Sequence, residues 1–223
     1  MNSQLNEDNL DNGLAERLYA KSDSADVLAD IYQDNINIAT WQRNLSSALS
    51  TAAQHVLNLD YAFQFAASVS PENTFESLSK ALGSKPETEA LAADVSEIVD
   101  MFCCLFDLEQ LGLRLATLDR AMCPKFHVDR VPCRLVATYH GVATEWLEHK
   151  FVDRSKLGMG SKGKTDEESG LYQRASDIQQ LQAGDVSLLK GESWLGNEGG
   201  GLVHRSPSVD INAKRLLLTL DFN

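Results

Sequence analysis

The sequence predicts a mixed α+β protein in which a helical first half is followed by a strand-rich second half. Apolar residues recur at helical spacing between residues 86 and 110, whereas beyond Gly112 they alternate with polar residues as strands require. The chain has 223 residues, of which 43% are hydrophobic and 23% charged. A chain of this length and composition can bury a substantial core, and wholesale disorder is excluded.

The helical candidates follow a polar, acidic segment, residues 1–13, which is typical of a flexible tail. Short helices are expected over Leu14–Ala20 and Ala25–Gln33. A longer helix, rich in Leu and Ala, is expected over Asn44–Leu57. Together with the helix described next, they predict a helical layer over residues 14–110.

The strongest helical pattern runs from about Pro86 to Gln110. Ser84 and Glu87 have the spacing of a capping box, in which each side chain satisfies a backbone N–H at the start of the helix. Gly112, just after this pattern, is expected to end the helix. The apolar positions at helical spacing are Leu91, Val95, Ile98, Phe102 and Leu105.

The second half, residues 111–223, carries the strands and is expected to form one integrated unit with the helices. In the last strand, the leucines at even positions and Phe222 share one face, whereas Arg215 lies on the other. We expect the apolar face to pack on the helices, which would direct Arg215 into the interior of a rolled sheet. The predicted strands are Leu111–Leu118, Arg134–Tyr139, Val186–Lys190, Gly201–His204 and Arg215–Phe222.

A long segment, Asp153–Ser176, separates these strands and contains several glycines and many charged residues. Segments of this length inside a compact domain are usually lids, binding loops or disordered insertions. Trp146, Trp194 and this segment are the candidates for the wall and lid of a pocket.

The net charge of −12 is unevenly divided. Residues 1–110 hold 18 acidic and 5 basic side chains, whereas residues 111–223 hold 14 acidic and 15 basic ones. General nucleic-acid binding is disfavoured, because Lys and Arg supply most of that affinity. The nearly neutral second half is still compatible with a cationic pocket for a small anion.

The chain offers no signal peptide and no apolar run long enough to span a bilayer, so we expect a cytoplasmic protein that does not bind membranes. In that compartment cysteines are usually reduced thiols rather than disulfides. The four cysteines are Cys103, Cys104, Cys123 and Cys133.

The residues that carry chemistry lie in the second half. His127 and Asp129 form a His-x-Asp pair, and His204 follows much later in the chain. Two imidazoles and one carboxylate on one face of an iron ion are the ligand set of non-haem Fe(II) oxygenases, because the opposite face stays open for other ligands. His-x-Asp alone is a weak signal, because two common polar residues fall at that spacing by chance.

The sequence resembles known proteins at two levels. The segments 126–129, 184–191, 203–207 and 215–221 resemble the Fe(II)- and 2-oxoglutarate-dependent oxygenases, which fold as a double-stranded β-helix, or jelly roll. Over nearly its whole length, including 41–43 and 133–139, the chain resembles a bacterial family known only as domain of unknown function 1826. That family implies no activity.

The oxygenase resemblance implies a double-stranded β-helix with an N-terminal helical layer. It implies His127, Asp129 and His204 as ligands of Fe(II), and Arg215 as the partner of the distal carboxylate of 2-oxoglutarate. Arginine suits that role because its planar fork donates two parallel hydrogen bonds to a carboxylate. The implied activity is a dioxygenase, or hydroxylase, whose substrate is a small molecule or a protein that the sequence does not specify, as it does not specify the oligomeric state.

Two other interpretations stay open. Cys123, His127, Asp129 and Cys133 offer thiolate, imidazole and carboxylate ligands within one short stretch, which suits zinc and a noncatalytic role in metal binding or metal homeostasis on the same scaffold. In the other interpretation, the scaffold is degenerate and only contacts a partner through its acidic helical half. Arg215 separates these alternatives, because an oxygenase needs it in the pocket.

Overall fold

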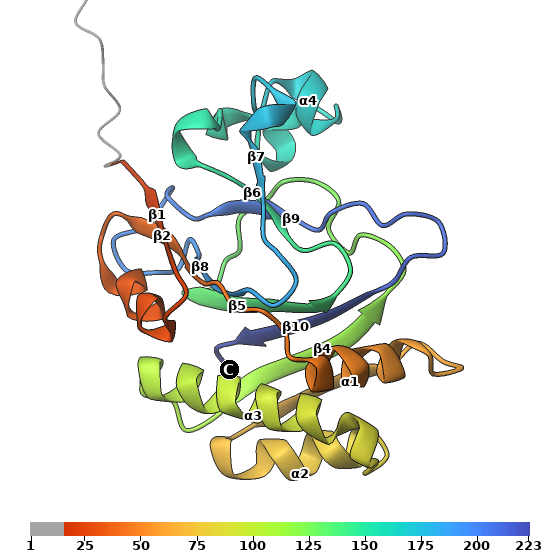
Figure 1. Ribbon diagram of the computed structural model, residues 1–223. Coiled ribbons are helices and arrows are strands. Elements are labelled where there is room, and N and C mark those ends of the chain that lie inside the picture. The colour runs from red at the N-terminus through yellow and green to blue at the C-terminus, as the bar shows by residue number, and fades with distance from the viewer. Residues whose placement is uncertain (1–15) are drawn as a thin grey trace, which may run out of the picture.

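The computed structural model of the protein describes residues 16–223 (Figure 1). The predicted tail, residues 1–13, and the first residues of the helix expected at Leu14–Ala20 lie outside the described residues. The described chain contains helices and two β-sheets, so the predicted α+β class is confirmed.

The larger sheet has seven strands in the order β1-β2-β8-β5-β10-β4-β3. All pairs are antiparallel except β1 with β2. The smaller sheet has the order β7-β6-β9, and lies above the larger one in Figure 1. The strands of the larger sheet are β1 (Leu18–Ser22), β2 (Ile36–Trp41), β3 (Gln64–Val69), β4 (Leu111–Leu118), β5 (Cys133–His140), β8 (Val186–Lys190) and β10 (Arg215–Asp221), and those of the smaller are β6 (Glu145–Leu147), β7 (Ile178–Gln180) and β9 (Val203–Arg205).

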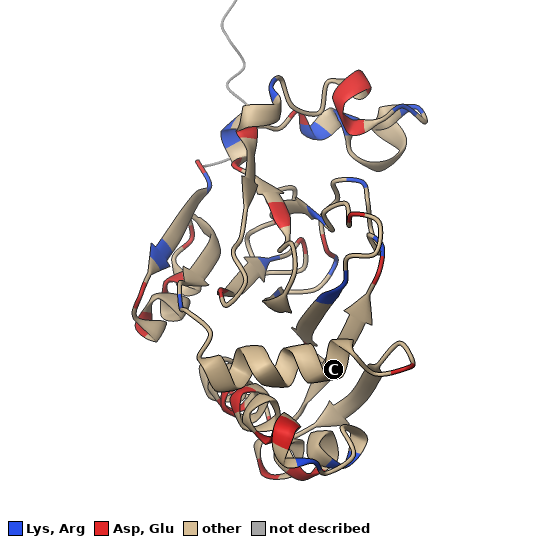
Figure 2. Ribbon diagram, turned by 45° about the vertical axis from the view of Figure 1, so that its right-hand side comes forward, with Lys and Arg blue, Asp and Glu red and all other residues tan. Residues whose placement is uncertain are grey.

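The helical layer covers the other face of the larger sheet, at the bottom of Figure 1. It consists of α1 (Ser47–Leu57), α2 (Pro71–Ala81) and α3 (Pro86–Phe106). A 3₁₀ helix, η1 (Ala25–Tyr32), lies where the second short helix was expected. In this layer, acidic residues lie along α2 and α3, whereas α1 has none, as the red segments of the ribbon in Figure 2 show.

The long helix α3 buries the apolar stripe that its spacing predicts. Leu91, Val95, Ile98 and Phe102 are all at most 1% exposed. The helix ends at Phe106, not near Gln110 as predicted, because Asp107 adopts the left-handed conformation, with φ of 53°, and Gly112 lies within β4. The predicted strand faces of β10 are confirmed as well, since Leu216, Leu218 and Leu220 join the same core as α3.

The first half is not purely helical, which corrects the prediction for residues 14–110. Leu18–Ser22 forms strand β1, where a helix over Leu14–Ala20 was expected. Strands β2 and β3, and helix α2, were not predicted at all. Five of the six residues of β2 are buried, so both of its faces are covered and no alternation marks it as a strand.

The capping box predicted from Ser84 and Glu87 is also wrong. Ser84 has a φ of 52° and belongs to the turn after α2, whereas the N-cap of α3 is Lys85, which makes no side-chain capping bond. Pro86 at the first helical position explains why the helix can begin without one, since its missing N–H needs no acceptor.

The segment Asp153–Ser176 contains regular structure, so of the three alternatives, a lid, a binding loop or a disordered insertion, the last does not hold. It contains the short helices η3 (Arg154–Lys156), η4 (Gly158–Ser161), α4 (Asp166–Ser169) and the start of η5 (Ala175–Asp177), after η2 (His149–Phe151). Leu171 and Tyr172 of this segment pack in a small core with Phe126, Leu147 and Val203. Among residues 16–223, no helix has the length and apolarity needed to cross a bilayer.

Truncating Leu218 tests the dependence of the fold on the buried face of β10. Leu218→Ala removes a fully buried side chain and leaves a cavity between β10 and the helical layer. We expect it to lower the free energy of unfolding, measured by urea denaturation, by about 2–5 kcal/mol. Leu195→Ala is the control, because Leu195 is 92% exposed. Equal effects of the two variants would contradict this assignment of the core.

Candidate metal centre

Two backbone hydrogen bonds place the histidines next to each other. His127 lies in the irregular segment between β4 and β5, and His204 lies in β9. Each donates its backbone N–H to the carbonyl of the other at 3.0 Å, which forms an isolated antiparallel bridge. Residues paired in this way direct their side chains to the same side of the ladder. The ring centroids are 4.6 Å apart.

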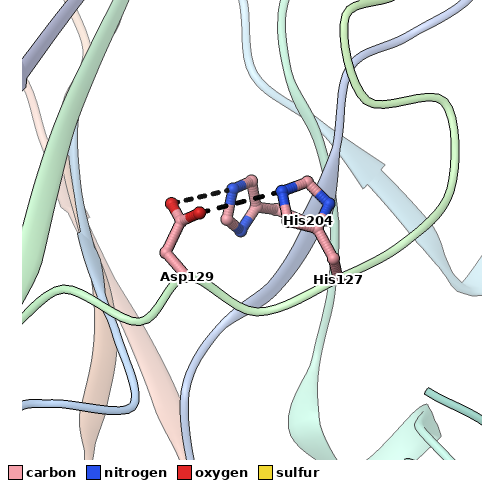
Figure 3. Close-up of side chains that lie close together, drawn as sticks. All are labelled: His127, Asp129 and His204. Carbon is pink, nitrogen blue, oxygen red and sulfur yellow. Dashed lines mark ion pairs between the residues drawn. The ribbon is translucent and has the colours of Figure 1, made fainter. Parts of the chain in front are cut away.

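Asp129 completes the cluster two residues after His127. Its Oδ1 is 3.8 Å from Nε2 of His127, and its Oδ2 is 3.3 Å from Nε2 of His204. Figure 3 shows the carboxylate facing both rings. One potential ligand atom from each of the three residues lies within 4.8 Å of the others. The structure therefore brings together the three residues that the sequence singled out.

Backbone carbonyls determine which ring nitrogen carries the proton in both histidines. Nδ1 of His127 is 3.0 Å from the carbonyl of Lys125, and Nδ1 of His204 is 3.2 Å from the carbonyl of Leu202. A carbonyl only accepts, so each Nδ1 carries a proton, and in a neutral ring Nε2 then has a free lone pair. This is the tautomer in which Nε2 binds a metal ion.

The electrostatics of the cluster favour an uncharged His127 ring and an ionised Asp129 carboxylate. Burial lowers the pKa of His127, and the neighbouring His204 lowers it further. Burial acts to raise the pKa of Asp129, but the hydrogen bond and charge of His204, with Arg134 and His127, outweigh it and bring the pKa to about 2. At neutral pH the cluster thus offers an ionised carboxylate and an uncharged His127 ring. Two imidazole nitrogens and a carboxylate oxygen that converge in this way suit a divalent cation, as the predicted ligand set requires.

Arg215 is buried without a partner. It is 0% exposed, and among the described residues its Nε, Nη1 and Nη2 have no acceptor. Burial lowers its pKa to about 10, against the charge of Glu145, so the guanidinium stays positive at neutral pH. A buried, unpaired cation is costly, and a bound anion would offset that cost.

The position of Arg215 agrees with the predicted direction of its side chain. Since Leu216 faces the helical layer, Arg215 faces the space between the two sheets. Gly141 makes room beside it, because a Cβ at that position would lie 2.6 Å from the carbonyl of Lys214 and 3.0 Å from Cγ of Arg215. Gly141 also has a φ of +84°, which favours glycine.

The cysteine-containing zinc site is not assembled. Cys133 is 0% exposed and belongs to the core beneath the helical layer, where burial raises the pKa of its thiol. Cys123 is exposed. Within residues 16–223, His127, Asp129 and His204 are the group that could hold a metal, and neither thiol joins it. The geometry of the three clustered residues still allows zinc to bind there without either thiol.

The two tryptophans proposed for the pocket wall have different positions. Trp146 pairs with His204 across β6 and β9 and packs in the small core between the sheets. Trp194 instead contacts Tyr32 and Phe106 on the helical side of the larger sheet. Trp194 therefore packs with the core under the helical layer and not with the small core that holds Trp146.

The segment Asp153–Ser176 is attached next to both histidines. Oδ2 of Asp166 accepts the backbone N–H of Phe126 at 2.9 Å and lies 3.4 Å from Nη1 of Arg205. The Arg205 guanidinium lies 4.2 Å from the ring centroid of Phe126, and its Nε donates to Glu145 at 2.6 Å. The residues flanking His127 and His204 thus hold this segment in place. Sequence reasoning missed Asp166, whose role depends on tertiary contacts alone.

Sequence reasoning also missed a charged network on the other side of Asp129. Arg134, at the start of β5, donates from Nη1 to Oδ2 of Asp129 at 2.8 Å. Its Nε and Nη2 donate to the two carboxylate oxygens of Asp221, at 2.7 and 2.9 Å. The register of β5 and β10 places Arg134 opposite Asp221, and that register is not visible in the sequence.

Comparisons with known proteins agree with the predicted resemblances. The family model described as "Protein of unknown function (DUF1826)" matches residues 22–221. No curated protein matches the chain in sequence.

Two solved structures have a similar fold. The rice dioxygenase for auxin oxidation is 11% identical, with 83% of this chain and 73% of that chain covered and a TM-score of 0.50. Dioxygenase for auxin oxidation 1 from Arabidopsis thaliana, in a complex with 2-oxoglutarate, is 6% identical, with 92% of each chain covered and a TM-score of 0.51. At these identities the likeness shows the fold alone. It confirms the resemblance to the fold of such dioxygenases over most of the chain, while the double-stranded β-helix itself stays a prediction.

Separate variants distinguish the clustered triad from the thiol-containing alternative. Because Cys123 lies outside the cluster, we expect Cys123→Ser to bind Co(II), measured by competition with a chelating dye, with unchanged affinity. His204→Ala removes one of three ligands and should weaken binding by more than about 100-fold, beyond the loss usual for an outer-shell residue. The reverse order of effects would contradict the triad.

Proposed function

We propose that this chain, which belongs to the DUF1826 family, is an Fe(II)- and 2-oxoglutarate-dependent oxygenase. In this proposal His127, Asp129 and His204 hold the iron, and Arg215 binds the distal carboxylate of 2-oxoglutarate. The observation that carries the proposal is the buried Arg215, whose three guanidinium nitrogens have no acceptor among the described residues. A metal cluster alone would leave that cation unexplained.

The donor set supports iron as the metal. Two imidazole nitrogens and one carboxylate oxygen suit the facial ligand set of non-haem iron oxygenases, which leaves coordination positions open for other ligands. Backbone carbonyls bind Nδ1 of both rings, which leaves Nε2 of each ring to face the Asp129 carboxylate, where the metal would lie. The low pKa of Asp129, about 2, keeps the carboxylate ionised at any physiological pH.

Arg215 supports a dicarboxylate as the second ligand. Its planar fork can donate two parallel hydrogen bonds to one carboxylate, and burial strengthens them. Glu145, the acidic group whose charge acts on Arg215, accepts a hydrogen bond from Arg205 at 2.6 Å. That carboxylate is therefore already engaged, which leaves Arg215 available for a ligand.

Iron and 2-oxoglutarate, when bound, would supply the oxidative chemistry: molecular oxygen is consumed, the 2-oxo acid is decarboxylated to succinate and a substrate is hydroxylated. The protein's own residues position these groups and exclude water. Trp146, opposite His204, belongs to an apolar cluster between the sheets with Val136 and Leu189. In this proposal, such an apolar wall would keep water away from the bound groups.

The second candidate function, noncatalytic metal binding on the same scaffold, is favoured by one observation. The three clustered donors suit zinc as well as iron, since zinc accepts imidazole and carboxylate ligands. This function makes no use of Arg215, so the effect of replacing that residue separates the two proposals.

Anaerobic titration with Fe(II) and 2-oxoglutarate tests the proposal. We expect the parent protein to develop the weak visible charge-transfer band of an iron-bound 2-oxo acid. His127→Ala should abolish the band because it removes a ligand. Arg215→Ala should require about 10–150-fold more 2-oxoglutarate, which corresponds to the loss of a charged hydrogen bond worth about 1.5–3 kcal/mol.

Arg43→Ala is the matched control. Arg43 makes a charged pair with Asp94 on the helical side of the sheet, so its loss should not change the affinity for 2-oxoglutarate. Tight metal binding with no dependence on Arg215 would refute the oxygenase and favour noncatalytic metal binding. Absence of metal binding in the parent would refute the triad itself.

A further inference from the structure

The carboxylate of Asp129 has less backbone support than the two histidines. His127 and His204 are fixed by their reciprocal backbone hydrogen bonds. Asp129 lies in an irregular segment, where its carbonyl accepts the N–H of Glu192 at 2.9 Å. That bond holds the main chain, but it does not fix the rotation of the side chain. A metal ligand in this position needs another group to orient its carboxylate.

Arg134 makes the contact that can do so. Its Nη1 donates to Oδ2 of Asp129 at 2.8 Å, while Oδ1 of Asp129 accepts no hydrogen bond from the residues that the structure describes. Oδ1 faces the His127 ring, at 3.8 Å from Nε2. Oδ2, which lies 3.3 Å from Nε2 of His204, is thus held by Arg134, and the same bond fixes the rotation that directs Oδ1 toward His127.

Asp221 fixes Arg134 in turn. It accepts two hydrogen bonds, from Nε at 2.7 Å and from Nη2 at 2.9 Å, so the planar guanidinium cannot rotate about its own axis. The side chains of Arg134 and Asp221 are 27% and 29% exposed, and that of Asp129 is 13% exposed. The charge of Arg134 is shared between two carboxylates, so Asp129 retains negative charge for a cation.

We propose that Arg134, anchored by Asp221, is a positioning residue that orients the carboxylate of Asp129 for metal binding. The inference rests on the proposed function, because it takes Asp129 as a metal ligand. Arg134 itself touches neither metal nor substrate in this assignment. Lysine could not replace it, since a single ammonium group lacks the fork that reaches both carboxylates.

Co(II) titration of the full chain tests this role, because the visible absorption of Co(II) reports its coordination geometry as well as its affinity. Arg134→Gln should weaken Co(II) binding by about 10–100-fold, the usual effect of losing an outer-shell partner. It should also change the position or intensity of the absorption bands. Asp221→Asn should act in the same direction with a smaller effect, since Arg134 keeps its bond to Asp129.

Arg43→Gln is the matched control for a purely structural effect. Arg43 forms a two-pronged pair with Asp94, at 2.6 and 2.8 Å, away from the metal centre. Its loss should lower the melting temperature, yet leave Co(II) affinity and spectrum unchanged. A purely structural role for Arg134 would produce the same pattern in Arg134→Gln.

The outcomes separate this inference from the proposed function. If the parent binds Co(II), and Arg134→Gln binds it within about twofold with the parent's spectrum, the positioning role is refuted while the triad stands. If Asp221→Asn has the parent's Co(II) affinity and spectrum while Arg134→Gln does not, the anchoring of Arg134 by Asp221 is refuted. A parent that binds no metal would overturn the inference together with the proposed function.

Discussion

The alternation of side chains along β10 is the constraint on which both the core and the candidate site depend. This strand lies between β5 and β4, so it is paired on both edges. Leu216, Leu218 and Leu220 are buried against the helical layer, which leaves the intervening residues to face the smaller sheet. A slip of one residue would bury the charged side chains among the helices and turn the leucines toward the site. The hydrophobic core therefore also determines where Arg215 and Asp221 point.

The parts of the site that could be predicted were those with a local signal or a family resemblance. The His-x-Asp pair is adjacent in sequence, and the faces of β10 follow from simple alternation. Arg134 and Asp221 have neither kind of signal, because their pairing depends on the register between β5 and β10. Asp166 was missed for a similar reason, since its carboxylate meets the N–H of Phe126 only in the folded chain.

The fold was predictable in its class and in its longest helix, but less so in the first half. α3 has 21 residues and a continuous apolar stripe, which a helical period detects easily. β1 has five residues and β2 has six, and β2 is covered on both faces, so period-two alternation is absent where it would have been needed. Ser84 and Glu87 matched a capping pattern by spacing alone, while the positive φ of Ser84 put the residue in the preceding turn.

The attachment of Asp166 to Phe126 has a consequence for local motion. The Phe126 amide is buried, and its acceptor belongs to α4 rather than to a neighbouring strand. When the segment around α4 detaches, this amide loses its acceptor, and the chain next to His127 loses one of its restraints. Local opening of the segment and disorder at the histidine are thus thermodynamically coupled, so a ligand that orders one must also slow hydrogen exchange in the other.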